Sequence, residues 1–446
     1  MTLFEIVQAL QNAPAKGGGK KAVLEANKNS NELAQYLKAV YDPRINYYLK
    51  KLPLVEVQGT DSFCADHIGS LISKLAKRQL TGVAAIKYLK AMLVSLDAQG
   101  QELVGYIIGR DIKAGVGEST ILEYFHELFY IPPYQRCASM SVDLKERFGQ
   151  MESFFVQSKS DGQFCYLSYL SDGTLSAMSR TGSLYPTWVA VELADMPIGS
   201  VAMGELLVHR DGVLLDRKTG NGVLNSVLSG DGSKFLPESD KLEYLVWDFV
   251  TEGEFKAGKS DRPYKERWKD IANYTGFKTI GSWEVTSVAE ANKIQRQHTS
   301  EGKEGTVWKN PEMSWRDCSS GDKDMMKAKT VFEAEFKIVG AYEGSGKYAG
   351  MLGGFDMESL DGFIKFSVGS GFNDEQRKAL WGQGDDACNG LIATCEGNDI
   401  VTSKGKNTES IFLPIFIEIR YDKTEADSRN RVWEQFEAAK LGEANE

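Results

Sequence analysis

Lys159 stands where a lysine side chain could act as a nucleophile. It follows a short apolar run at 154–156, expected to be a strand, and precedes Asp161-Gly162. Asp-Gly favours a tight turn, and a turn after a strand presents a side chain on a rigid support. The alternative is an ordinary surface charge. A lysine amine has an unperturbed pKa of about 10.4, so it attacks only when a nearby cation or desolvation favours its neutral form.

Side chains suited to phosphate follow further along the chain. Arg180, in the sequence Ser-Arg-Thr-Gly at 179–182, is expected where a strand turns, and arginine suits bidentate contact with phosphate. Lys327 and Lys329 alternate on an expected strand, which puts both on one face. Two cations there could neutralise a phosphate chain and lower the pKa of a neighbouring amine. The alternatives are a charge at a hairpin tip and a solvated strand edge.

Two acids and a tryptophan complete the set. Glu205 is a lone carboxylate inside an apolar run. Because burying an unpaired carboxylate is costly, it either faces solvent or binds a cation or a ribose hydroxyl. Glu304 leads into another strand-like run, and both acids together could hold Mg²⁺, which takes oxygen ligands and substrate phosphates. Trp247 lies in an apolar run, either as a core residue or as a stacking face for a purine base.

In this order the residues supply an amine, cations for phosphate, acids for a metal and an aromatic ring. Together they fit attack by an amine on the α-phosphate of a nucleotide.

Two glycine-lysine sequences, at 17–20 and 344–347, superficially resemble P-loops. Lys21 and Tyr348 stand where a P-loop needs Ser or Thr, so both segments are predicted to be flexible loops.

The elements that must position these residues divide the chain into three expected domains. Residues 1–132 have apolar residues at helical spacing, and prolines at 132 and 133 end that pattern. Residues 133–330 mix short β-like runs with helical stretches at 262–274 and 287–299, which predicts an α+β domain. Residues 331–446 contain strand-like runs and a helical tail at 426–441, which suits a small β-barrel such as an OB-fold.

The expected strands fall in the second and third domains. Besides 154–156, they are 164–170, 201–208, 244–250, 306–309, 335–342, 353–358, 363–368, 390–396 and 415–419.

Composition limits the compartment and the partners. Of the 446 residues 42% are hydrophobic, but no run approaches the ~18 apolar residues that span a bilayer, so no membrane partner is expected. The N-terminus lacks the pattern of a secretory signal. Six cysteines without paired spacing, at 64, 137, 165, 318, 388 and 395, make a structural zinc site improbable and favour a reducing cytoplasm.

Charge is unevenly distributed along the chain. The net charge is −10, yet residues 1–132 carry 15 Lys and Arg against 13 Asp and Glu, and the remainder carries 37 against 49. A slightly basic first module joined to an acidic body is compatible with nucleic-acid binding, which depends on local patches.

The order Lys-x-Asp-Gly, Ser-Arg, Gly-Glu, Trp-Asp, Glu-Gly, Lys-x-Lys resembles the covalent nucleotidyltransferase superfamily of ATP-dependent DNA ligases, RNA ligases and mRNA capping enzymes. Segments 78–82 and 110–115 look like the helical DNA-binding domain of DNA ligases. Segment 368–372 looks like their OB-domain signature, and 412–415 with 420–423 resembles their last motif, which helps to orient the leaving pyrophosphate. The resemblance covers nearly the whole chain and is greatest to the three-domain ligases of large tailed bacteriophages.

The resemblance implies a fold, two cofactors and a set of residue roles. The fold is multidomain: an all-α DNA-binding domain, an α+β nucleotidyltransferase (ATP-grasp-like ligase) domain and an all-β OB-fold domain. The cofactors are ATP and Mg²⁺, and Lys159 would be the catalytic residue that forms a lysyl-AMP adduct. Nucleotide contacts are implied for Ser158, Asp161, Gly162, Arg180, Glu205, Trp247, Lys327, Lys329, Arg420 and Lys423. Metal contacts are implied for Glu205 and Glu304, and DNA contacts for Arg78, Arg110, Lys113 and Arg180.

One position departs from the family pattern. The family often has an arginine two residues after the glycine of its first motif, and Phe164 stands there instead. The phosphate contact usually made by that arginine is then absent or comes from another side chain, for which Arg180 is a candidate.

The implied function is ATP-dependent sealing of nicks with 5′-phosphate and 3′-hydroxyl ends in duplex DNA, in replication, repair and recombination. An RNA ligase or capping enzyme shares the core chemistry, but capping enzymes and most RNA ligases lack the N-terminal helical module. An inactive nick-binding protein is a second alternative, to which Phe164 gives slight support. The expected partner is nicked double-stranded DNA. The protein is expected to be a monomer in the cytoplasm, that of a bacterial host if phage-encoded.

Overall fold

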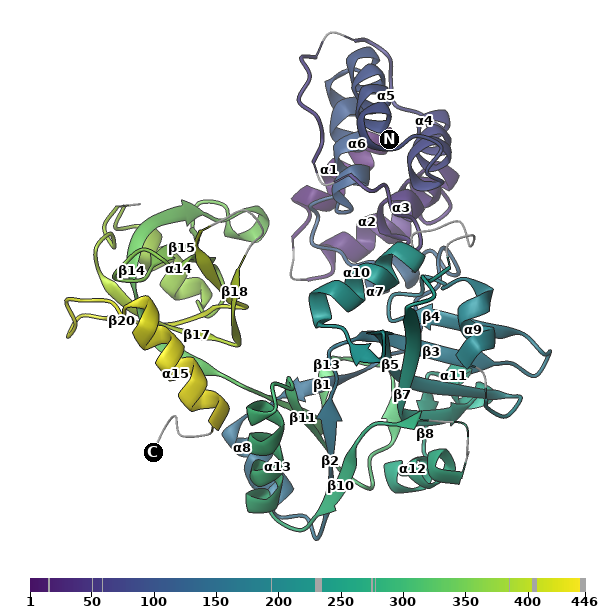
Figure 1. The fold of residues 1–446 in the computed structure, drawn as a ribbon. Coiled ribbons are helices and arrows are strands. Elements are labelled where there is room, and N and C mark those ends of the chain that lie inside the picture. Colours follow the sequence, from purple (N-terminus) through teal and green to yellow (C-terminus); the bar gives the residue numbers. More distant parts are fainter. Residues whose placement is uncertain are drawn as a thin grey trace. The chain divides into compact units, whose positions relative to one another are not determined.

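The computed structural model describes residues 1–14, 17–49, 51–57, 59–193, 195–228, 235–273, 276, 278–384, 386–402 and 407–441 (Figure 1). The chain forms two compact units. One comprises Met1–Pro132 with Thr181–Leu184, and the other comprises Pro133–Arg180 with Tyr185–Glu446. No helix among the described residues is long and apolar enough to cross a membrane.

The first unit is helical, as its apolar spacing predicts. Its first helix begins at a capping box, in which Thr2 and Glu5 satisfy each other's backbone N–H groups. Its inward side chains share one core with those of the later helices. The helices are α1 (Leu3–Asn12), α2 (Gly19–Asn27), α3 (Asn31–Tyr41), α4 (Ala65–Leu71), a π-helical turn (Ile72–Ala76), α5 (Gly82–Ser95), α6 (Ala98–Gly109) and α7 (Glu118–Leu122).

The second unit begins with two mixed sheets. The first has the strand order β1-β13-β11-β2-β10, and the second has β4-β3-β5-β7-β9 with β6 paired to β5. The bounds of these strands are β1 (Gln135–Ser139), β2 (Phe154–Lys159), β3 (Gln163–Tyr169), β4 (Leu175–Ser179), β5 (Ser200–Arg210), β6 (Val213–Leu214), β7 (Asp240–Thr251), β9 (Lys278–Thr279), β10 (Ser282–Val285), β11 (Gly305–Lys309) and β13 (Cys318–Lys329).

Helices cover the outer faces of both sheets (Figure 1). Apolar residues of α8 and α13 pack on one face of β2, and those of α9 and α10 pack on β3 and β5. The helices are α8 (Val142–Gly149), α9 (Thr187–Leu193), α10 (Arg217–Leu228), α11 (Glu252–Ala257), α12 (Tyr264–Asn273) and α13 (Val288–Ser300), and β8 (Lys259–Ser260) pairs with β12 (Trp315–Arg316).

Alternation along β2 decides which way Lys159 points. Phe154 and Val156 pack toward α8 and α13, whereas Phe155 packs with Tyr264 on the opposite face. Lys159 lies four residues after Phe155 on the same strand, so both side chains point to the same face, away from α13. Tyr264 joins the two sheets on this face: it accepts a hydrogen bond from Gln157 Nε2 at 2.7 Å and donates one to the Trp247 carbonyl at 3.0 Å.

A third sheet follows, with the order β16-β15-β14-β17-β20, beside the two-stranded ribbon β18-β19. Its core is rich in phenylalanine, and the ring centres of Phe372 and Phe416 lie 4.2 Å apart. The bounds are β14 (Phe332–Glu343), a 3₁₀ turn (Gly346–Tyr348), β15 (Leu352–Glu358), β16 (Lys365–Val368), α14 (Asp374–Trp381), β17 (Ile392–Gly397), β18 (Asp399–Thr402), β19 (Glu409–Phe412), β20 (Ile415–Arg420) and α15 (Arg429–Leu441).

The predicted strands and long helices are present, with shifted ends. The helix expected at 262–274 is α12 (its last predicted residue, 274, lies outside the described residues), and the one at 287–299 is α13, capped by Ser287. The two P-loop-like segments were predicted to be flexible loops, but each contributes to a helical element: Gly19 begins α2, and Gly346–Tyr348 forms a 3₁₀ turn. The elements that were not predicted from the sequence include α8, α9, α10, α11, α14, β1, β10 and the β18-β19 ribbon.

Candidate active site

Strand register assembles the site from segments far apart in the sequence. β11 lies between β2 and β13, and Gly305 is paired with Lys159 on one side and with Lys329 on the other. Glu304 directly precedes Gly305, so its carboxylate lies between the two lysines. Gly305 has φ +142°, and a Cβ there would lie 2.1 Å from the Ala328 carbonyl oxygen, so only glycine fits this crossing.

Glu304 binds both lysines at once. Lys159 Nζ lies 2.5 Å from Glu304 Oε2, and Lys329 Nζ forms an ion pair with Glu304 Oε1. The side chains are only 24%, 12% and 20% exposed for Lys159, Glu304 and Lys329. Although burial alone would raise it, the pKa of Glu304 is lowered, chiefly by Lys159 and by hydrogen bonds from Asp161 and the two lysines. Glu304 therefore stays ionised and forms ion pairs with both lysines.

Asp161 lies at the same point, after the end of β2. Burial and the neighbouring Glu304 raise the pKa of Asp161. Arg217 Nη1, at the start of α10, lies 3.3 Å from Asp161 Oδ1 and 4.0 Å from Glu304 Oε1. Three cations thus surround two carboxylates at the predicted nucleophile, and the sequence reading missed one of these cations, Arg217.

Glu205 approaches the same turn from β5. β3 and β5 pair Phe164 with Glu205, and a Cβ on Gly162 would lie 2.8 Å from Glu205 Cγ and 2.3 Å from the Leu206 carbonyl oxygen. The turn after Lys159 therefore needs glycine at 162 in order to pack on β5. Burial raises the pKa of Glu205 to about 8, although Lys159 opposes the shift. A bound cation would favour the ionised form of Glu205 and so offset the cost of burying its charge.

The acids suit a hard cation in their chemistry. Glu304 and Asp161 both raise the pKa of Glu205, which places the three carboxyl groups within electrostatic range of one another. Carboxylate oxygens are ligands that Mg²⁺ accepts. Within the described part of the chain, no group of three or more His, Cys, Asp or Glu residues could hold a metal ion on its own. A metal at this site would therefore need further oxygen ligands.

Trp247 belongs to an aromatic cluster that includes the unusual Phe164. The half-buried Trp247 ring lies 5.5 Å from the Phe164 ring, which is also 4.5 Å from Tyr166 and 5.2 Å from Tyr134, all between centres. The guanidinium of Arg180 lies 5.3 Å from the centre of the Tyr134 ring. Phe164 thus occupies its position as a packing residue and offers no charge there.

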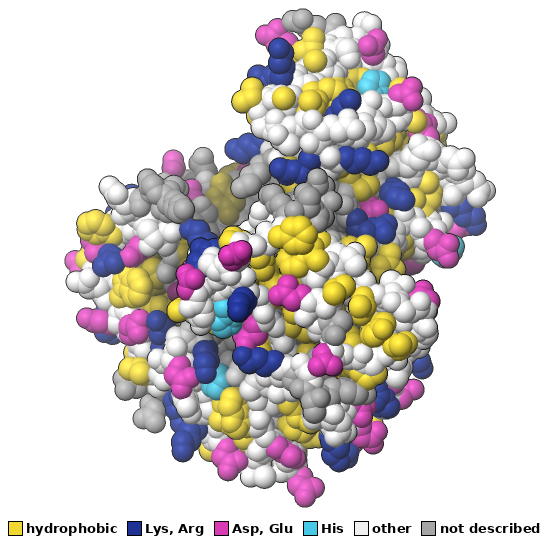
Figure 2. All heavy atoms as spheres, turned by 45° about the vertical axis from the view of Figure 1, so that its right-hand side comes forward, with side chains coloured by type: hydrophobic (Ala, Val, Ile, Leu, Met, Phe, Trp, Pro, Cys, Tyr) yellow, Lys and Arg dark blue, Asp and Glu magenta, His cyan; other side chains and the backbone are white. Residues whose placement is uncertain are grey.

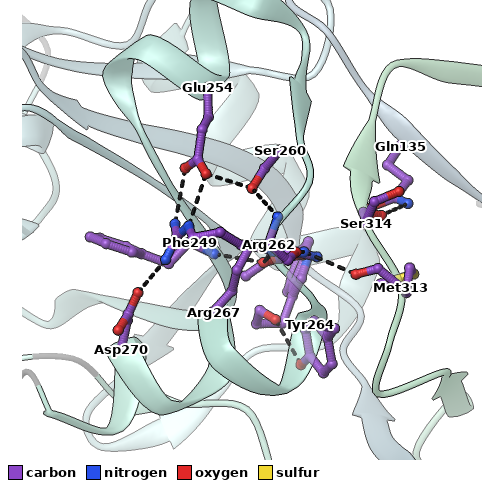
Figure 3. Close-up of polar contacts among 12 residues, drawn as sticks. Gln135, Phe249, Glu254, Ser260, Arg262, Tyr264, Arg267, Asp270, Met313 and Ser314 are labelled. Atoms are coloured by element: carbon purple, nitrogen blue, oxygen red, sulfur yellow. Dashed lines mark hydrogen bonds and ion pairs between the residues drawn. The ribbon is translucent and has the colours of Figure 1, made fainter.

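A buried polar network fixes the strand that carries Trp247. Its neighbour Asp248 accepts two hydrogen bonds from Arg267 of α12, at 2.7 and 3.0 Å, and both side chains are buried. Figure 3 shows Arg267 also reaching Met313, and Arg262 lying between Glu254 and Asp270. Lys309 Nζ donates to the Trp247 carbonyl at 3.1 Å, and burial lowers the pKa of Lys309 to about 8.

Two further predicted nucleotide contacts, Ser158 and Lys327, lie on opposite faces of the first sheet. Ser158 points toward α13, where its Oγ lies 2.7 Å from Nε2 of the buried His298, so it supports β2 from the outer face. Lys327 stands two residues before Lys329 on β13, and burial together with Lys329 lowers the pKa of Lys327. The interior face of the sheet therefore carries Lys159, Lys327 and Lys329.

Arg420 and Lys423 lie at the end of the third sheet. Arg420 Nη1 and Lys423 Nζ lie 2.9 and 2.7 Å from the same oxygen of Glu335, on β14. Arg420 also pairs with Asp422 at 2.7 Å. Glu335, which the sequence reading missed, therefore holds both cations of this motif together.

The three DNA-binding candidates of the helical unit have different environments. The guanidinium of Arg78 is 4.5 Å from the Tyr48 ring centre, and Lys113 is exposed beside Asp111. Arg110 instead donates to the carbonyls of Asp42, at 2.8 Å, and Ile45, and burial lowers its pKa. Arg110 thus has a structural role within the unit. Figure 2 shows basic and acidic side chains interspersed on the visible face, with several Lys and Arg near one another on the helical unit.

Lys159, Glu205, Glu304 and Lys329, which the structure brings together, belong to the motif order that resembles covalent nucleotidyltransferases. A sequence model of the DNA ligase OB-like domain matches residues 343–392. The DNA ligases of phages T4 and T6 are each 26% identical to this chain, over 94% of it and 95% of their own length. The solved structure named Pmar-Lig_Pre has the same fold, with a TM-score of 0.71 at 20% identity over 94% of this chain and 99% of its own.

These likenesses confirm the resemblance to DNA ligases that the motif order predicts, and to phage DNA ligases in particular. They support an enzyme that joins DNA ends.

Proposed function

We propose that this protein is an ATP-dependent DNA ligase that seals nicks in duplex DNA through a lysyl-AMP intermediate on Lys159. The observation that carries the proposal is the register of β2, β11 and β13, which sets Lys159 and Lys329 on either side of Glu304. A half-buried amine surrounded by cations and acids is suited to attack on a phosphate whose charge must be neutralised.

In the first step the Lys159 amine attacks the α-phosphorus of ATP. A nitrogen–phosphorus bond forms, the bond to the β-phosphate oxygen breaks, and pyrophosphate leaves. Lys159 must first leave its ion pair with Glu304 and pass its proton to solvent, because the lowered pKa of Glu304 makes that carboxylate a poor base. Phosphate oxygens that bind Lys327 and Lys329 would compete with Glu304 for Lys329.

The next two steps use the same site. An oxygen of the 5′-phosphate at the nick attacks the phosphorus of the adduct, the nitrogen–phosphorus bond breaks, and AMP is transferred to the DNA end. The 3′-hydroxyl then attacks the 5′-phosphorus, a phosphodiester bond forms, and AMP leaves. The exposed cations Arg180, Arg78 and Lys113 are our candidates for DNA contacts, and Arg420 and Lys423 for contacts to the leaving pyrophosphate.

Mg²⁺ is our proposed metal, held by Glu205 and, once its lysines are released, by Glu304, with substrate phosphates as further ligands. When bound it would stabilise the charge that develops on the phosphate oxygens. Trp247 is proposed to stack on the adenine base. The protein is proposed to act as a monomer in a host cell's cytoplasm, in replication, repair and recombination.

Sealing of a 5′-labelled nicked duplex tests this function. We expect sealing with ATP and Mg²⁺ and none when NAD replaces ATP. Lys159→Ala should abolish sealing. Sealing of a nicked RNA substrate tests the alternative of an RNA ligase, and labelling of the protein by GTP tests that of a capping enzyme. If the wild type seals no DNA nick under any of these conditions, the proposal is wrong.

A further inference from the structure

Arg217 lies on α10, outside the sequence motifs that resemble the ligase family, and its side chain contacts the two carboxylates beside Lys159. It is the first residue of α10, and its guanidinium lies 3.3 Å from Asp161 and 4.0 Å from Glu304. Glu304 is already bound by two lysines, so Arg217 is the outermost of the cations around it. Its side chain is 51% exposed. A charge so placed can exchange these long contacts for a ligand that enters from solvent.

The position of Arg217 is fixed by its helix. Asp216 accepts hydrogen bonds from the backbone N–H groups of Lys218 and Thr219, at 3.0 and 3.1 Å, and so caps α10. Gln163, directly after the turn that follows Lys159, donates to Asn225 Oδ1 of α10 at 2.8 Å. The helix is therefore fastened to the turn that carries Asp161, and its positive end faces the same region.

The two positions considered so far for a guanidinium near Lys159 are 164 and 180. Phe164 occupies the place where related sequences often have an arginine, and it is packed among aromatic rings. Arg180 lies over the ring of Tyr134. Arg217 lies 5.7 Å from the centre of the Phe412 ring, and its closest carboxylate oxygen, on Asp161, is 3.3 Å away. Its planar fork suits two oxygens of one phosphate.

We infer that Arg217 binds a phosphate group beside Lys159 and supplies the guanidinium that Phe164 does not. This inference rests on the proposed function. The phosphate belongs either to the triphosphate of ATP or to the 5′-end of the nick, since both must reach the atom next to Lys159.

The test compares Arg217→Ala with Arg217→Lys and with the matched control Lys218→Ala, the next residue, whose side chain is exposed. Single-turnover rates are measured for formation of the Lys159 adduct and for sealing of a pre-adenylated nick. A charge-assisted hydrogen bond predicts a loss of about 10- to 100-fold for Arg217→Ala, an intermediate loss for Arg217→Lys and none for Lys218→Ala. Loss in adduct formation assigns the phosphate to ATP, and loss in nick sealing alone assigns it to the DNA end.

A binding measurement separates phosphate contact from general damage. In a Lys159→Ala background, adding Arg217→Ala should weaken binding of ATP or of a 5′-phosphorylated nick and leave binding of adenosine or an unphosphorylated nick unchanged. Equal rates and equal affinities with and without Arg217 would overturn the inference. Loss of adenosine binding to the same degree would also overturn it. A wild type that forms no adduct would instead overturn the proposed function, so the two failures are distinguishable.

Discussion

Glu205 is costly to keep in its half-buried position beside Lys159. Its pKa is raised to about 8 by burial, which means that the folded protein binds a proton that the unfolded chain releases near pH 4.5. The folded state therefore loses stability as pH rises from about 4.5 to about 8. A binding site often retains such a group because its cation or substrate relieves the cost when bound.

Glu205→Gln should consequently stabilise the free protein at pH 8 and change little at pH 5. Glutamine resembles the protonated acid and does not ionise. It therefore removes the loss of folding stability that Glu205 causes as pH rises above about 4.5. We expect a gain of about 1 kcal/mol or more at pH 8, or roughly 2–4 °C per kcal/mol in melting temperature for a domain of this size. Thermal unfolding at both pH values checks this, and an equal effect at pH 5 and pH 8 would contradict it.

At the scale of elements, α12 is attached to β7 by one buried ion pair. Arg267 and Asp248 are 0% and 4% exposed, and removing one partner of such a pair leaves an uncompensated charge. Arg267→Ala should therefore destabilise the protein by about 3–5 kcal/mol. Arg262→Ala, near the start of the same helix, should cost about 1 kcal/mol or less, because its partners Glu254 and Asp270 are partly solvated (Figure 3).

Chemical denaturation of the two arginine variants measures this difference. If both variants lose the same stability, the buried pair does not hold α12, and the helix depends on its apolar contacts instead.

The third sheet offers a second test at this scale. Glu335 binds Arg420 and Lys423 through one oxygen, so it keeps both cations close together. If these cations orient pyrophosphate, Glu335→Gln should slow formation of the Lys159 adduct about tenfold, the value of one weakened charge-assisted contact. Sealing of a pre-adenylated nick should be unchanged. Glu333→Gln, an exposed residue on the same strand, is the control, and equal rates for both variants would contradict the role of Glu335.

Much of this element list could be predicted from the sequence, because short apolar runs bounded by Gly, Asp and Asn mark β3, β5 and β7 and helical spacing marks α12 and α13. The helix α10 escaped prediction since two glycines interrupt it and its apolar residues become meaningful only when they pack on β5. The site residues could be proposed singly, but their assembly depends on register. Gly305 had to pair with both Lys159 and Lys329, and no local pattern specifies that pairing.

At the scale of the whole molecule, the net charge of −10 must be reconciled with a polyanionic substrate. Contacts limited to phosphates release counterions, so affinity for a nicked duplex should fall steeply with salt and vary little with base sequence. Six such contacts predict a loss of about 10³-fold between 50 and 200 mM salt. Fluorescence anisotropy with two unrelated nicked duplexes measures both properties, and salt-independent binding would contradict the expected mode.

The most direct test of the central claim is to locate AMP on the protein. The protein is incubated with ATP and Mg²⁺ but no DNA, digested, and its peptides are analysed by mass spectrometry. The account predicts a single AMP adduct on Lys159, lost with pyrophosphate and discharged by a 5′-phosphorylated nick. An adduct on another residue, or full adduct formation by Lys159→Ala, would contradict it.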